Sequence, residues 1–105
     1  MQNEPKRLVT DKERDEFRRT GVVCLRDMFD VAWIERMQGA VDNAIANPGP
    51  MHLKLDQGMA GKFHGDSFVW TWQDDFRAFM FESPAAHIAQ QVLGATERVT
   101  LFFDT

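Results

Sequence analysis

The stretch DVAWIERMQGAVDNAIANPGP, residues 30–50, decides the fold because it joins the longest helical pattern of the chain to its strongest helix breaker. Asp30 is a good N-cap for a helix. The apolar residues that follow recur at helical spacing and form one stripe, namely Val31, Ile34, Met37, Val41, Ala44 and Ile45. The Asn-Pro-Gly-Pro run at 47–50 should end the helix.

Upstream of this helix, the sequence predicts a flexible arm, a short helix and a buried strand. Residues 1–9 are expected to form the arm. Thr10 and Glu13 fit a capping box, in which each side chain binds the backbone amide of the other. The helix should end at Gly21, which takes the left-handed conformation easily. Val22–Leu25 is apolar and rich in β-branched residues, and predicts a short buried strand.

Downstream, extended and helical patterns alternate. The expected elements are a loop at 48–62, a strand at 68–72, helices at 74–81 and 83–94, and a strand at 98–105. This mixture indicates the α+β class, with a single domain over residues 10–105. The last strand is apolar up to Phe103, and such a strand needs neighbours to pair with. We therefore expect the chain to be a truncated piece of a larger domain.

Composition excludes several classes of protein. The net charge of −4 gives no basic footprint for a nucleic acid. No run approaches the 18 apolar residues of a membrane span, and residues 1–9 lack the apolar centre of a signal peptide. The default location is therefore the cytoplasm. The single cysteine, Cys24, lies within an apolar run and is expected to be buried.

His64 and Asp66 are the candidates for metal binding. A His-x-Asp pair on one strand supplies two ligands of the 2-His-1-carboxylate site for non-haem Fe(II). The third ligand would be His52 or His87, and a small metalloprotein built from these four residues is one hypothesis. Gly65 favours instead a turn in which Asp66 binds the backbone, and this interpretation is preferred.

Trp70, Trp72 and Asp104 are the candidates for a substrate pocket. The two tryptophans alternate, so they would share one face of a strand and either line a pocket or fill the core. Core packing is the commoner role. Asp104 follows three apolar residues and would face either a polar cavity or solvent. No residue is assigned a catalytic role, and no nucleotide, zinc or hydrolase motif occurs in the sequence.

Three stretches occur in an order and spacing that resemble a known family. The first is FRRTGVVCLRDMF at 17–29, followed by AWIERM at 32–37. The second is GDSFVW at 65–70, continuing to FRAFMFESPAA at 76–86, and the third is VLG at 92–94, leading to LFFDT at 101–105. Together they resemble the phytanoyl-CoA dioxygenase family, which are Fe(II)- and 2-oxoglutarate-dependent oxygenases.

The resemblance implies helices followed by the first strands of a double-stranded β-helix (jelly-roll) oxygenase domain. It implies Fe(II) and 2-oxoglutarate for the full-length parent, which would hydroxylate a small-molecule substrate. The family's metal-binding His-x-Asp pair comes after the strand that starts at Leu101, so no metal ligand is carried over and this chain alone should be inactive. By position, Trp70 and Asp104 would lie on the substrate side. The alternative is a small non-enzymatic interaction module that pairs through the edge of the C-terminal strand, residues 99–105.

Overall fold

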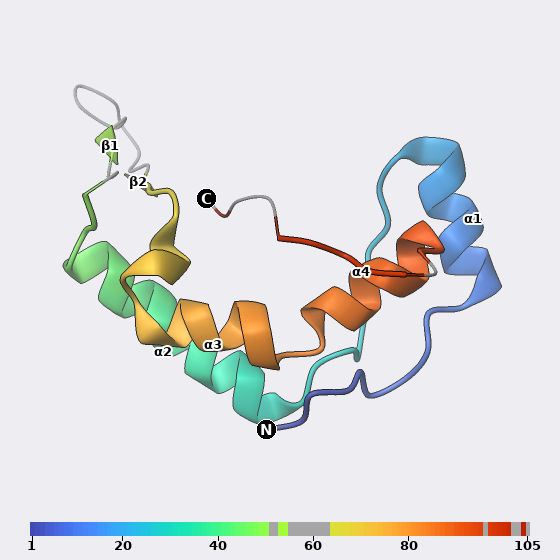
Figure 1. The fold of residues 1–105 in the computed structure, drawn as a ribbon, viewed down its shortest axis with the longest axis horizontal. Coiled ribbons are helices and arrows are strands. Elements are labelled where there is room, and N and C mark those ends of the chain that lie inside the picture. Colours follow the sequence, from blue (N-terminus) through green and yellow to red (C-terminus); the bar gives the residue numbers. More distant parts are fainter. Residues whose placement is uncertain (51–52, 55–63, 96, 102–103, 105) are drawn as a thin grey trace.

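Four helices carry the fold (Figure 1): α1 (Asp11–Thr20), α2 (Val31–Ala46), α3 (Asp74–Glu82) and α4 (Ala85–Leu93). A single 3-10 turn, η1 (Val69–Thr71), precedes α3. The structure is a computed structural model that describes residues 1–50, 53–54, 64–95, 97–101 and 104, with the backbone alone at 53, 54 and 64. In this part of the chain, the only strands are the two-residue pair β1 (Leu53–Lys54) and β2 (His64–Gly65), which is antiparallel.

The predicted helix ends at Thr10, Gly21, Asp30 and Gly94 are confirmed, whereas the helix expected from residue 83 begins at Ala85. At the start of α1, the Glu13 N–H donates to Thr10 Oγ1 and the Thr10 N–H donates to the Glu13 carboxylate, which completes the capping box. Gly21 closes α1 in the left-handed conformation, and Gly94 does the same for α4. Asp30 caps α2 by accepting the Trp33 N–H. These ends follow from local hydrogen bonds, which the sequence encodes directly.

The α+β expectation is wrong, because the described residues form a helical structure and show no start of a jelly roll. Val22–Leu25 is not in a strand, and the described residues of 98–105 are not in a strand either. The segment expected as a strand at 68–72 instead coils into η1. Apolar β-branched and aromatic residues fit a pleated surface only where a neighbouring strand supplies the other half of the ladder.

Cys24 is exposed, which corrects the expectation that it is buried. The exposure of the side chains alternates along Val22–Leu25, as in a segment whose successive side chains point to opposite sides. Val23 and Leu25 pack against the core, whereas Val22 and Cys24 face solvent. The apolar run is therefore half buried.

The core lies in two clusters that meet at Phe29. One cluster joins Val9, Met28, Ile88 and Val92, with Phe29 packed against it. The other lies between α2 and α3, where Trp33 meets the Phe79 ring edge-on at a centroid distance of 6.0 Å. Phe29 also stacks on Phe79 at 5.5 Å, so its ring contacts both clusters.

Residues 1–9 run alongside the fold and join segments that are distant in sequence. The Trp33 indole donates to the Gln2 carbonyl at 2.7 Å, and the Lys6 N–H donates to the Met28 carbonyl at 2.9 Å. The Val9 N–H donates to the Gln91 side chain of α4 at 2.7 Å. These bonds give the arm a defined path, while its flexibility stays a prediction.

The molecule is an open arch, as Figure 1 shows, with α1 and α4 at one end, β1 and β2 at the other, and α2 and α3 between them. The segment after α4 turns back into the hollow of the arch. The radius of gyration is 15.7 Å, whereas a compact domain of this length has about 13 Å. An open shape of this kind leaves much apolar surface in contact with water.

Candidate functional site

Trp70 and Asp104, both expected on the substrate side, come together in the structure. The Trp70 N–H donates to Asp104 Oδ2 at 3.3 Å, and the Phe68 N–H donates to the Asp104 carbonyl oxygen at 3.0 Å. Phe68 has a left-handed backbone at φ 55°, an unusual conformation for a bulky side chain. The backbone N–H groups of Phe68, which precedes η1, and of Trp70, within η1, thus both donate to Asp104. The second carboxylate oxygen, Oδ1, is buried and has no hydrogen-bond partner among the described residues.

Trp72 makes a different contact, with Gly49 in the segment that follows α2. Its indole ring lies so close to Gly49 that a Cβ at position 49 would overlap with it. The indole N–H is buried and finds no hydrogen-bond partner in the described part of the chain. Gly49 is therefore required by close packing, and Trp72 acts as a packing residue in the described structure.

Asp66 has a backbone-binding arrangement. Its side chain is 7% exposed, and its carboxylate accepts the Gly49 N–H and the Ser67 N–H, each at 2.9 Å. The bond from Gly49 holds residue 49 next to residue 66 in space, although they are 17 residues apart in the sequence. This agrees with a carboxylate that binds the backbone. The side chain of His64 and all of His52 lie outside the described residues.

The described residues do not fit an Fe(II) site of the facial-triad kind. Such a site needs two imidazoles and one carboxylate around the metal, but the described part of the chain brings no three His, Cys, Asp or Glu residues together. The one histidine whose side chain is described, His87, is an exposed α4 residue whose Nδ1 lies 2.9 Å from Glu4 Oε2. We therefore assign no metal ligand among the described residues.

Arg77 is a site residue that the sequence reasoning missed. Its guanidinium lies over the ring of Trp70 at 5.7 Å and over the ring of Phe81 at 5.4 Å. These two rings also meet edge-on, with centroids 5.6 Å apart. The four-residue spacing from Arg77 to Phe81 signals that they share a helix face, but only the folded chain brings Trp70 to them. Arg77 thereby fixes the Trp70 ring beside the Asp104 contact.

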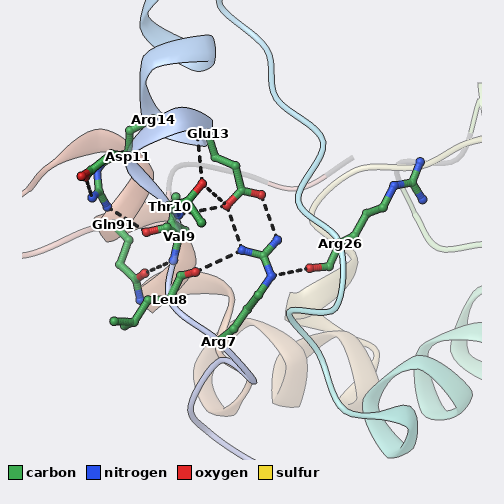
Figure 2. A network of polar contacts seen from close by, with 9 residues as sticks. All are labelled: Arg7, Leu8, Val9, Thr10, Asp11, Glu13, Arg14, Arg26 and Gln91. Carbon is green, nitrogen blue, oxygen red and sulfur yellow. Dashed lines mark hydrogen bonds and ion pairs between the residues drawn. The ribbon is translucent and has the colours of Figure 1, made fainter.

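The densest polar network lies elsewhere, where the arm meets α1 (Figure 2). Arg7 donates to both carboxylate oxygens of Glu13 at 2.8 Å, and its Nε donates to the Arg26 carbonyl at 2.8 Å. The Arg7 guanidinium and the Thr10 N–H lower the pKa of Glu13 to about 2, and the same pair raises the pKa of Arg7. Shifted pKa values often mark active sites. Here the capping box and the ion pair account for the shift, so this network is structural.

We expect Glu13→Gln to remove a pH-dependent part of the stability. The pKa of Glu13 is about 2 in the folded chain, against an ordinary value of 4.5. The stabilisation is therefore complete above the ordinary value and is lost as the pH falls toward the folded value. The difference in melting temperature between wild type and Glu13→Gln should be largest above about pH 5 and smallest near about pH 2.

Glu16→Gln is the control for this pH dependence, because Glu16 lies on the same helix and its carboxylate has no hydrogen bond among the described residues. A melting-temperature difference for Glu13→Gln that stays constant, or that grows toward low pH, would contradict the assignment. Circular dichroism melts at matched ionic strength give the comparison.

Comparison of the chain with protein-family models, with curated proteins and with solved structures gives no match. Within the described part of the chain, no helix has both the length and the apolarity needed to cross a membrane. The family resemblance therefore stays a prediction, and the case for a function depends on the contacts around Asp104.

Proposed function

We propose that these residues are the helical segment of a phytanoyl-CoA dioxygenase-like, Fe(II)- and 2-oxoglutarate-dependent hydroxylase, and that they supply the substrate side of its active site. The contact between Trp70 and Asp104 supports this proposal. Both residues were assigned to the substrate side by position alone, and they lie 34 residues apart in the sequence. The metal ligands would come from other residues of the parent polypeptide.

The free oxygen of Asp104 is the chemical feature that supports a binding role. A buried carboxylate oxygen without a donor is unfavourable, since most buried polar atoms find a partner. Oδ1 of Asp104 can accept a hydrogen bond from a hydroxyl, amide or amine of a bound molecule, while Oδ2 remains bonded to Trp70. The backbone of Trp70 binds Asp104, and its ring lies under the Arg77 guanidinium and edge-on to Phe81. A few polar groups among aromatic side chains are a usual arrangement for orienting a small molecule.

The expected result for the 105-residue chain is that it releases no succinate from 2-oxoglutarate, even with Fe(II) and ascorbate present. The polypeptide encoded by the whole reading frame around these residues should release succinate. In that polypeptide, we expect Asp104→Asn to turn over 2-oxoglutarate, in the absence of the substrate to be hydroxylated, at a rate within about twofold of the wild type. The reason is that Asp104 is not a metal ligand in this proposal. Its stimulation by any compound that activates the wild type should fall by roughly tenfold or more, which corresponds to one hydrogen bond.

Asp74→Asn provides the control, because Asp74 is an exposed carboxylate in the first turn of α3. It should leave both activities unchanged. Succinate release by the 105-residue chain above a metal-free blank would overturn the proposal. So would a reading frame that contains no further His-x-Asp pair, or an Asp104→Asn variant that abolishes turnover without substrate.

The alternative of an interaction module that pairs through residues 99–105 stays a prediction. Val99–Leu101 is not in a strand, and the Asp104 carbonyl already accepts the Phe68 N–H. Neither observation favours strand pairing, so the oxygenase segment is the function proposed.

A further inference from the structure

Helix α2 has two separate apolar faces. Trp33, Ala40 and Ala44 are buried, and α2 packs against α3. A second set of apolar side chains is exposed, namely Val31 at 62%, Ile34 at 48%, Val41 at 45% and Ile45 at 52%. At 100° per residue, this second set lies roughly a third of a turn away from the buried one. One helix face is thus used by the fold, and the other is left in contact with water.

The exposed face has the spacing of a helix-pairing seam. Its members, with Gln38 between them, lie at 31, 34, 38, 41 and 45, which is the alternating three-and-four pattern of positions a and d in a coiled coil. Beside this seam runs a groove of about 690 Å³, which Phe29, Ile34, Met37, Val41 and Phe79 line among others. A row of exposed apolar residues next to a groove suits the apolar face of another helix.

Two carboxylates flank one side of the seam. Glu35 follows Ile34 and Asp42 follows Val41, so both occupy the position next to d, seven residues apart. Both are exposed, and neither forms an ion pair or hydrogen bond with any described residue. Arg36, by contrast, lies on another side of the helix and is paired with Asp75 at 2.7 Å. The seam therefore presents apolar residues with uncompensated negative charge along its edge.

This charge argues against a second copy of the chain as the occupant, because parallel pairing of two α2 helices would set Glu35 and Asp42 opposite Asp30 and Met37, which are not basic. Two copies of α2 that paired in antiparallel fashion would bring these flanking positions together, carboxylate against carboxylate. No basic residue of α2 lies at a seam or flanking position to relieve the repulsion, because its single basic residue is the paired Arg36. A helix with Lys or Arg next to its apolar stripe would satisfy both the apolar seam and the carboxylates.

We propose that the face formed by Val31, Ile34, Val41 and Ile45 binds a basic amphipathic helix of a partner protein. Glu35 and Asp42 pair with Lys or Arg side chains of that helix, while its apolar stripe covers the seam. This interaction goes beyond the proposed enzymatic function and does not depend on it, since Trp70 and Asp104 lie on other elements.

The test uses the 105-residue chain and two synthetic helical peptides of about 18 residues, the length at which isolated helices become stable. Both carry Leu at positions a and d, and they differ in having Lys or Glu at e and g. Fluorescence anisotropy should show that the Lys peptide binds the wild type at least roughly tenfold more tightly than the Glu peptide. The preference should weaken as the salt concentration rises.

Three variants identify the surface. Ile34→Asp should weaken binding of the Lys peptide by roughly tenfold or more, and the double variant Glu35→Lys with Asp42→Lys should reverse the preference to the Glu peptide. Leu8→Asp, at another exposed apolar side chain, should leave affinity unchanged. All variants are first checked for a wild-type circular dichroism spectrum and melt.

Equal binding of the two peptides, no binding of either, or no reversal in the charge-swapped variant would overturn the proposal. A wild-type chain that has the mass of a dimer by light scattering, and becomes a monomer in Ile34→Asp, would also overturn it. In that case the occupant of this face is a second copy of the chain.

Discussion

Replacement of Trp33 with alanine should lower the free energy of unfolding by about 3–5 kcal/mol. Trp33 is 2% exposed and is one of the two largest fully buried side chains among the described residues. Its ring packs edge-on against Phe79 at 6.0 Å, and the Arg36 guanidinium lies 5.6 Å from its centroid. The variant removes these contacts and leaves the Gln2 carbonyl without the indole donor. A domain of this size is stabilised by only about 5–15 kcal/mol, so Trp33→Ala should be largely unfolded at moderate urea concentrations.

Trp33→Phe is the matched control, since it keeps an aromatic ring and removes the donor. It should cost clearly less than Trp33→Ala, with about 1 kcal/mol of the loss due to the hydrogen bond to Gln2. Urea denaturation followed at 222 nm measures both variants. A loss below about 1 kcal/mol in Trp33→Ala would contradict the placement of this ring in the core.

Met28→Ala should have the second largest effect, a loss of about 2–5 kcal/mol. Met28 is 2% exposed and packs with Val9, Ile88 and Val92. These residues come from the arm, from the segment before α2 and from α4. Truncation of Met28 therefore opens a cavity at the point where three separate parts of the chain meet. The surrounding backbone cannot fully collapse into this cavity, because the Met28 carbonyl also accepts the Lys6 N–H.

Met28→Leu is the control, because it changes the shape of the side chain but keeps most of its volume. A swap that conserves volume usually costs less than about 1.5 kcal/mol, so Met28→Leu should remain close to wild type in the same urea experiment. Similar losses in the two variants would show that the shape of the methionine, and not the filled volume, stabilises this cluster.

The parts of the fold that the sequence predicted are those that depend on neighbouring residues. The capping box at Thr10, the N-cap at Asp30 and the left-handed Gly21 each involve atoms a few residues apart, and all three are confirmed. The predicted strands depended on partners elsewhere in the chain. Propensity alone cannot tell a strand from an unpaired extended segment, since the ladder partner is not local.

The sequence likewise predicts only part of the candidate site. Trp70 and Asp104 were named, but their mutual contact spans a sequence separation that no local pattern encodes. Arg77 was missed because its partner Trp70 lies on η1, which was expected to be a strand.

The apolar stripe of α2 was recognised as one face. The structure places Ala44 in the buried set, together with Trp33, whereas Val31, Ile34, Val41 and Ile45 remain exposed. Periodicity shows that a face is apolar, but it does not show what covers it.

The path of the N-terminal arm has a consequence for the order in which the chain folds during synthesis. Val9 binds Gln91, and Glu4 meets His87, so residues of the arm have their partners on α4, which is synthesised later. These contacts cannot form until α4 has also emerged, although α1 can form its own capping box at once. We therefore expect the arm to dock late, and a nascent chain stalled before α4 emerges should leave residues 4–9 open to proteases.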